Sequence, residues 1–130
     1  MPTQIIDASL HTTAFPPTYI GPGNLIGNCI QANTASADVF GFFTSAGNAV
    51  QINCGFAALQ VEITDVTGVL MWKWQLGMPA TNTMKSAAAA LSVDTTGAIT
   101  VTSDPAGNTN VTLSAALVGT GKVICFHVQG

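Results

Sequence analysis

The feature that most constrains the fold is a series of short segments in which apolar and polar residues alternate, each bounded by turn-forming residues. The clearest is Leu59–Thr64, where alternate residues would place Leu59, Val61 and Ile63 on one face. A turn at Thr67-Gly68 leads into Val69–Gln75. There, an apolar face would lie opposite Lys73 and comprise Leu70, Trp72 and Trp74. The two segments predict a β-hairpin.

Further segments of this length continue to the end of the chain. Strands are expected at Val39–Phe43, Val50–Asn53, Ala98–Ser103, Asn110–Leu113 and Lys122–Val128. The last is nearly all apolar, which predicts a central strand. Met84–Val93 is ambiguous because its alanine run favours a helix, and Ser114–Val118 could form one helical turn ended by Gly119. The pattern predicts an all-β fold, an antiparallel β-sandwich or jelly roll, with a small barrel as the alternative.

The first 35 residues differ from the rest and hold four of the six prolines, Pro2, Pro16, Pro17 and Pro22. Proline disfavours helix, so residues 1–35 are expected to form an extended N-terminal arm with a short strand near Gln4–Leu10. Residues 36–130 would form the β-sandwich, giving a single domain overall. The arm residues expected to contact a partner are Phe15, Pro16, Pro17, Tyr19 and Ile20, because their apolar surfaces have no evident core register. Packing against their own domain is the equally weighted alternative.

Charge is scarce. Charged residues make up 7% of the chain, whereas soluble domains carry about 25%. There is no arginine, and three lysines under a net charge of -3 argue against nucleic-acid binding. Strand edges are usually protected by lysine, so the scarcity predicts a surface covered in a stable assembly. A carbohydrate-binding surface rich in threonine and asparagine is the alternative.

Three groups of residues have side chains that could carry chemistry, and a structural role is favoured for each. Cys125 and His127 would share a strand face, but no oriented base or electropositive setting accompanies them, and Cys125 is expected to be a buried, inert thiol. Glu62 and Asp65 could flank a groove as a glycosidase pair, although solvated strand and turn positions are favoured. The two tryptophans could stack on a sugar, but packing in a core is favoured. No catalytic residue is predicted.

No metal, cofactor or membrane site is expected either. The cysteines, Cys29, Cys54 and Cys125, are odd in number and lack C-x-x-C spacing, which argues against a disulfide framework and a zinc site. The two histidines lie far apart in the sequence. The start of the chain lacks the pattern of a signal peptide, and no run approaches about 18 consecutive apolar residues, so no membrane partner is expected.

Four short motifs stand in order along the second part of the chain. They are Gly55-Phe56, Val61-Glu62-Ile63, the W-x-W-x-x-G-M segment Trp72–Met78, and Gly119–Phe126, which is similar to a G-x-x-K-V sequence followed by an apolar strand. In these motifs, roughly residues 50–130 resemble a family of small head proteins of tailed bacteriophages. Ala57-Ala58-Leu59 departs from the aromatic residue and proline that usually follow G-F in the family.

The resemblance implies a capsid decoration (cement) protein that binds the major capsid protein and itself, as a homodimer or homotrimer. It would be made in the host cytoplasm and located on the capsid surface of the virion. It would act without an enzymatic step or cofactor, with no nucleic-acid or membrane partner. A receptor- or glycan-binding β module of a tail appendage is the alternative, and it predicts that Trp74 or Tyr19 lines a groove. A small enzyme using Cys125 is a third, weaker hypothesis.

Overall fold

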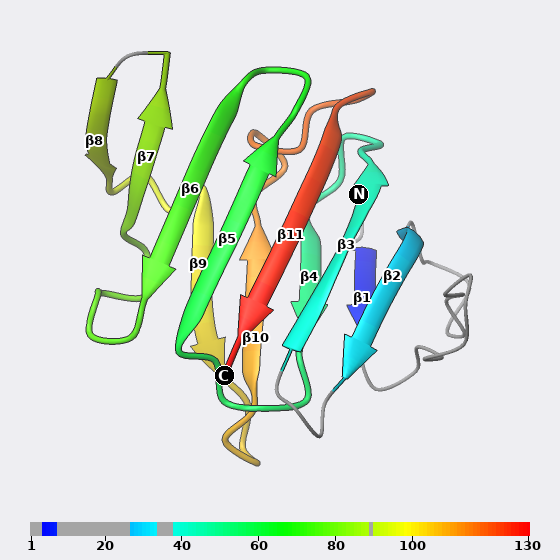
Figure 1. Cartoon of the computed structure of the whole chain (residues 1–130), viewed down its shortest axis with the longest axis vertical. Helices are drawn as coiled ribbons and strands as arrows, with labels where there is room; N and C mark the ends of the chain where they lie inside the picture. The colour runs from blue at the N-terminus through cyan, green and yellow to red at the C-terminus, as the bar shows by residue number, and fades with distance from the viewer. Residues whose placement is uncertain (1–3, 8–26, 34–37, 89) are drawn as a thin grey trace.

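The computed structural model describes residues 4–7, 27–33, 38–88 and 90–130, and over these residues the protein is an all-β sandwich (Figure 1). Most of the predicted arm, including its five expected contact residues, lies outside the described residues. Two parts of the first 35 residues are described, and both are strands. Residues 4–7 confirm the predicted strand near Gln4–Leu10. No helix in the described part of the chain is long and apolar enough to cross a membrane.

The larger sheet has seven strands in the order β2-β3-β11-β5-β6-β7-β8, all antiparallel to their neighbours. Its strands are β2 (Gly27–Asn33), β3 (Asp38–Thr44), β11 (Val123–Gln129), β5 (Gln60–Asp65), β6 (Leu70–Gln75), β7 (Thr83–Ala87) and β8 (Ala90–Asp94). The last strand in the sequence, β11, lies between β3 and β5, as its apolar sequence predicts.

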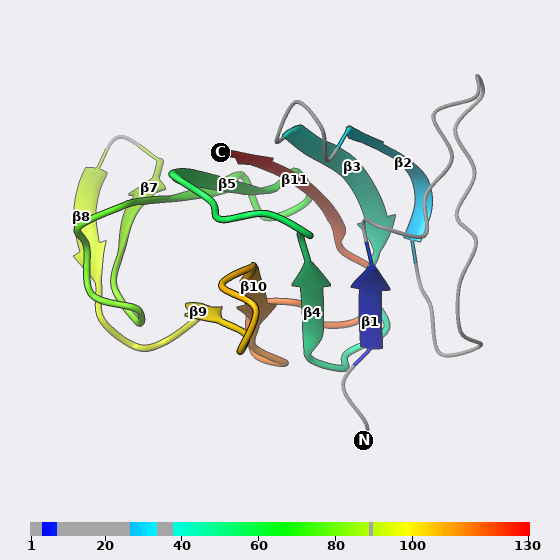
Figure 2. The same ribbon diagram turned by 90° about the horizontal axis from the view of Figure 1, so that it is seen from below.

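The smaller sheet has four strands in the order β1-β4-β10-β9. They are β1 (Gln4–Asp7), β4 (Val50–Asn53), β10 (Thr109–Leu113) and β9 (Ile99–Ser103). β1 runs parallel to β4, and the other pairs are antiparallel. Figure 2 shows the two sheets as layers, with β4, β10 and β9 facing the inner side of β3, β11 and β5.

The predicted hairpin is formed by β5 and β6, whose register pairs Glu62 with Lys73. Val61 and Ile63 are buried, and so are Trp72 and Trp74 on the neighbouring strand. The prediction for Leu59 was wrong, because this residue precedes the strand and its side chain is 50% exposed. It does not share the buried face of Val61 and Ile63.

The core lies between the two sheets and is built from alternate residues of each strand. On β11, Ile124, Phe126 and Val128 are buried while their neighbours are partly exposed. They meet buried aliphatic residues of the smaller sheet, namely Val50, Ile52, Val111, Leu113, Ile99 and Val101. The side chains of the larger sheet that point away from this core form a separate surface.

The ambiguous segment Met84–Val93 contributes to β7 and β8, which form a hairpin, so a helix there is wrong. Ala88, which follows β7, has a φ of 53°. Ser114–Val118 does form a single turn, in which the Val118 N–H donates to the Ser114 carbonyl at 3.1 Å. Most of β8 is exposed, so this hairpin extends the sheet without adding to the core.

Candidate interaction surface

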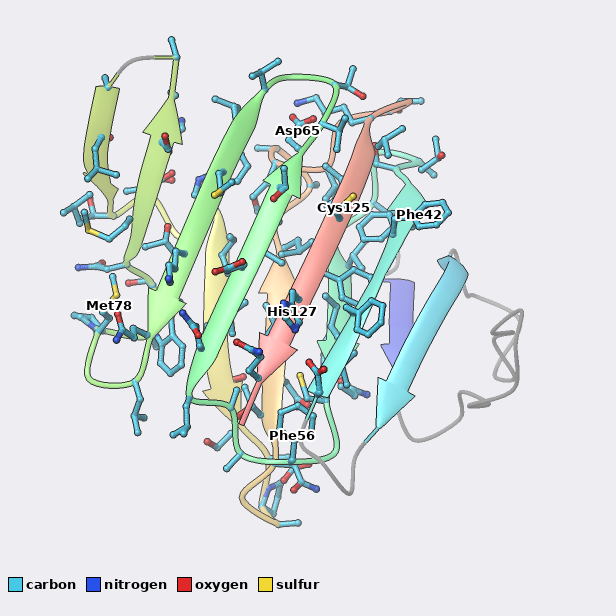
Figure 3. All side chains as sticks on the ribbon, viewed as in Figure 1. Phe42, Phe56, Asp65, Met78, Cys125 and His127 are labelled. Atoms are coloured by element: carbon cyan, nitrogen blue, oxygen red, sulfur yellow. The ribbon has the colours of Figure 1, made fainter. Side chains whose placement is uncertain are left out.

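The outer face of the larger sheet carries two straight rows of side chains that cross several strands. Residues directly opposite one another on neighbouring strands share a face, so the register defines each row. The His127 row is Phe40, His127, Glu62, Lys73, Met84 and Val93. The Cys125 row is Phe42, Cys125, Thr64, Met71, Ser86 and Leu91. Figure 3 shows Cys125 and His127 along β11, with Phe42 on the adjacent strand.

Large apolar side chains are exposed at both ends of these rows. Phe40 and Phe42 on β3 are 43% and 39% exposed. At the other end, Met71, Leu91 and Val93 are 47%, 69% and 56% exposed. Aromatic residues and methionine are enriched at protein interfaces, and apolar residues grouped on one face mark interaction sites more often than scattered ones do. Exposed aromatic, methionine and aliphatic side chains make this face a candidate interaction surface.

The charges on this face have partners on the same face. The Lys73 Nζ lies 3.6 Å from Glu62 Oε1, and the His127 Nε2 lies 2.7 Å from Asp38 Oδ1. Phe40 contacts the His127 ring edge to face, with centroids 6.0 Å apart. Exposed ion pairs add little stability, but they lower the cost of covering the face, because no isolated charge has to lose its water.

Cys125 and His127 lie on one face, as predicted, and Asp38 hydrogen-bonds the histidine. The expectation of a buried Cys125 was wrong, because the thiol is only partly buried on the outer face. A cysteine nucleophile needs an adjacent base and a position for the reacting carbonyl with donors to its oxygen. Neither of the two cavities described below includes Cys125 or His127. The three residues thus lie on an open sheet surface.

Glu62 and Asp65 do not form a pair, because they point to opposite faces of β5. Glu62 is on the outer face, whereas Asp65 is fully buried, so the prediction of a solvated Asp65 was wrong. Asp65 Oδ1 accepts a hydrogen bond from the Gly68 N–H at 2.8 Å, and Lys122 Nζ lies 3.6 Å from Oδ2. Asp65 therefore holds the β5–β6 turn and the start of β11 together.

An apolar cavity of about 340 Å³ lies between the tips of the β5–β6 and β7–β8 hairpins. Its lining includes the exposed residues Val66, Val69 and Met71, together with Ala88. Val69 has a φ of 56° and Ala88 a φ of 53°. Left-handed backbone is costly for residues with a Cβ, most of all for a β-branched one, and such strain is concentrated at functional sites. The cavity extends the apolar end of the Cys125 row.

A second cavity of about 390 Å³ opens at the side of the sandwich and is lined by Trp72, Lys85, Asp94, Ser114 and Lys122, among others. The Trp72 indole N–H donates to Asp94 Oδ2 at 3.1 Å, and Lys85 Nζ lies 5.6 Å from the ring centroid. Trp72 and Trp74 are 4% and 6% exposed, which confirms their predicted packing in the core. Trp74 lines neither of these two cavities, and Tyr19, the other residue of the glycan-binding expectation, lies outside the described residues.

The carboxylate of Asp94 accepts hydrogen bonds from Trp72 and Thr96 beside this cavity. Hydrogen bonds from the Thr96 hydroxyl and backbone N–H, together with the Trp72 indole and the charge of Lys85, lower the pKa of Asp94 below its usual value.

Cys54 is in the core, where burial raises the pKa of its thiol to about 12. Over the described residues, no three His, Cys, Asp or Glu side chains gather as metal ligands would.

No protein-family model, curated protein or solved structure matches the chain. The candidate surface was not identified from the sequence, although a signal was present. Phe40, Phe42, Cys125 and His127 are out of phase with buried neighbours on the same strands, and alternation alone assigns them to the outer face. The five expected contact residues in the arm lie outside the described residues.

Proposed function

We propose that the protein is a structural virion protein, a capsid decoration (cement) protein that stabilises the head of a tailed bacteriophage by binding the major capsid protein. The observation that carries the proposal is the outer face of the seven-stranded sheet, with its exposed apolar side chains and paired charges. A surface of this kind is suited to lasting burial against another protein.

The mechanism needs contact area and no chemical step. Apolar burial contributes about 25 cal/mol per Å² removed from water, part of which is lost to the cost of association. A decoration protein is present in many copies, so a modest contact at each position adds up over the shell. The arm residues Phe15, Pro16, Pro17, Tyr19 and Ile20 are proposed as further contacts with the capsid or with a neighbouring copy.

The resemblance to phage head proteins supports this proposal at the level of the fold. Trp72 and Trp74 of the W-x-W-x-x-G-M segment are core residues, and Met78 packs against the core. Gly77 has a φ of 104°, which glycine adopts more readily than any other residue. The segment that carries the resemblance thus forms the second strand of a hairpin and the turn after it.

The test is co-sedimentation with heads of the encoding phage that were assembled without this protein. We expect saturable binding by the wild type, and at least a tenfold loss of affinity for the double variant Phe40→Ser with Phe42→Ser. A double variant with Leu59→Ser and Leu76→Ser is the matched control, because these residues are also exposed but lie in connections outside both rows.

Thermal unfolding of each variant would verify that the loss of binding is not a loss of folding. Failure of the wild type to bind heads at any stage of expansion would overturn the proposal. Saturable binding of a glycan in an array screen, without binding to heads, would favour the tail-appendage alternative.

A further inference from the structure

The strand β8 is an unprotected edge of the larger sheet. It pairs with β7 on one side, and no described strand pairs with its other side. Ala90, Leu91, Ser92 and Val93 are all exposed. The strand contains no lysine, proline or bulge, which are the usual devices that stop an edge from pairing with another chain. Figure 2 shows β8 at the far side of the molecule from β1 and β2.

The edge strand of the smaller sheet differs in this respect. The Val101 N–H on β9 donates to the Ala80 carbonyl at 2.8 Å, so the loop after β6 covers part of that edge. The side chains of Ile99 and Val101 on β9 are also buried in the core. The backbone groups along the free side of β8 have no such cover among the described residues.

We propose that β8 pairs in an antiparallel manner with β8 of a second copy of this chain. The two-fold axis would pass midway between Ser92 of one copy and Ser92 of the other, so that the two larger sheets become one continuous sheet. The proposal goes beyond head binding, because it concerns a different part of the molecule and can hold in the free protein.

The register follows from symmetry and strand length. A two-fold axis perpendicular to the sheet keeps the outer face of both copies on the same side, and opposed residues must point to the same face. The two numbers in each opposed pair must therefore add up to an even total. Among the allowed registers, only the one centred on Ser92 pairs all five residues of the strand.

The side chains suit this register. Leu91 would lie opposite the partner's Val93 on the outer face, where aliphatic cross-strand pairs are favourable. Asp94 would lie opposite the partner's Ala90, so the two carboxylates do not face each other. In each copy, Leu91 and Val93 are the last residues of the two rows. At the junction these residues would meet those of the partner, and part of their exposed surface would become buried.

The contact is small. Pairing over five residues falls short of the roughly 1,200 Å² that stable complexes bury, so the dimer is expected to be weak in dilute solution. Holding two copies side by side raises their effective concentration and makes such a contact persistent. Chemical trapping is therefore a better test than a measurement of mass in dilute solution.

The test is disulfide trapping of Ser92→Cys in the full chain, with Cys29→Ser and Cys125→Ser to remove other thiols and with the buried Cys54 retained. Opposed residues in an antiparallel pair have Cα atoms about 4.5–5.5 Å apart, within the range that a disulfide spans. Under mild oxidation we expect the disulfide-linked dimer to form at least tenfold faster than for Ser103→Cys, an exposed serine on the edge strand β9. Adding Val93→Lys should abolish the difference.

A mixture of two variants tests the register. Leu91→Cys should link to the partner's Cys at position 93 when the second protein carries Val93→Cys. Neither should link efficiently to itself, because equivalent positions would be about 8 Å apart. Trapping of Ser92→Cys no faster than of Ser103→Cys overturns the proposal, as does a link formed only to capsid protein. Rapid trapping without head binding would support the pairing and count against the proposed function.

Discussion

The two faces of the seven-stranded sheet are built from the same strands, yet they differ in how far their side chains are buried. On β3, Phe43 points inward and is fully buried, while its neighbour Phe42 points outward and is 39% exposed. On β11, Phe126 lies in the core, while Cys125 and His127 lie on the surface. Both faces are rich in apolar residues, but only the inner one is covered within the described chain.

This difference separates stability from function. The smaller sheet covers the inner face of the larger sheet, so the residues of the inner face form the core and stabilise the fold. The outer face exposes aromatic, methionine and aliphatic side chains that contribute little to the folded monomer, so burial by a partner is the physical reason we infer for their presence. Perturbing the inner face should therefore affect stability, and perturbing the outer face should affect binding.

The largest effect is expected on the free energy of unfolding, when Phe43 and its neighbour Phe42 are replaced in turn. Phe43→Ala should lower the free energy of unfolding by about 3–5 kcal/mol, because it leaves a cavity in a packed core. Phe42→Ala should lower it by less than about 1 kcal/mol, because the ring is already partly in water. Urea unfolding followed by the fluorescence of the buried Trp72 and Trp74 measures both. Equal losses would show that the outer face is part of the core.

The second effect compares the thiols of the two environments. Cys125 on the outer face should react with iodoacetamide at pH 8 at least about 100-fold faster than Cys54, because the reactive species is the thiolate and access is required. Burial raises the pKa of Cys54 to about 12, so this thiol stays protonated at pH 8. Peptide mapping by mass spectrometry reads each site separately, and unfolded protein provides the control. Comparable rates in the native protein would contradict the assigned burial.

The sequence predicted the strands whose two faces differ most. The alternation in β5 and β6 and the apolar run of β11 were sufficient, because burial on one face imposes a period of two residues. The hairpin of β7 and β8 could not be assigned from the sequence, because β8 is exposed along most of its length and only Thr83 of β7 is fully buried, so no period of two marks either strand. Its alanine run favours a helix locally, and the strands form by pairing with β6, a contact that sequence pattern does not report.

The candidate surface was also missed, for a different reason. Cys125 was expected to be buried because its neighbours are apolar, yet its phase opposes that of Ile124 and Phe126. Asp65 was expected in water because aspartate favours turns, yet it is in phase with Val61 and Ile63. In both cases residue type was given more weight than position in the strand, and position decided the outcome.

The third effect concerns Asp65, the single acidic residue among the fully buried side chains of the described residues. A Cβ on Gly68 would lie 2.6 Å from Asp65 Oδ2, so Gly68→Ala should push the carboxylate away and lower stability by about 1–2 kcal/mol. Gly119→Ala is the matched control, because its added Cβ would meet the Lys122 side chain at an ordinary 3.5 Å. Urea midpoints that fall equally for both variants would argue against a structural role for the Asp65 contact.

The smallest effect lies where the inner face opens to water, at Asp94. Its folded pKa is lowered, chiefly by the Thr96 hydroxyl, so its contribution to stability is fully present above the unfolded pKa and is lost as the pH falls through the folded value. Asp94→Asn keeps the shape and removes the charge. At pH 7 it should cost roughly 0.5 kcal/mol or less, because solvent screens a partly exposed carboxylate.

The free energies of unfolding of wild type and Asp94→Asn should therefore differ at neutral pH and converge as the pH falls through the lowered folded pKa of Asp94, where the wild-type carboxyl itself becomes protonated. Thermal melts between pH 2 and pH 7 would follow this convergence. A constant difference across the range would mean that the loss comes from packing against Trp72 and not from the charge. In that case the hydrogen bond to the indole, 3.1 Å long, would be the main contact by which Asp94 holds this edge of the inner face closed.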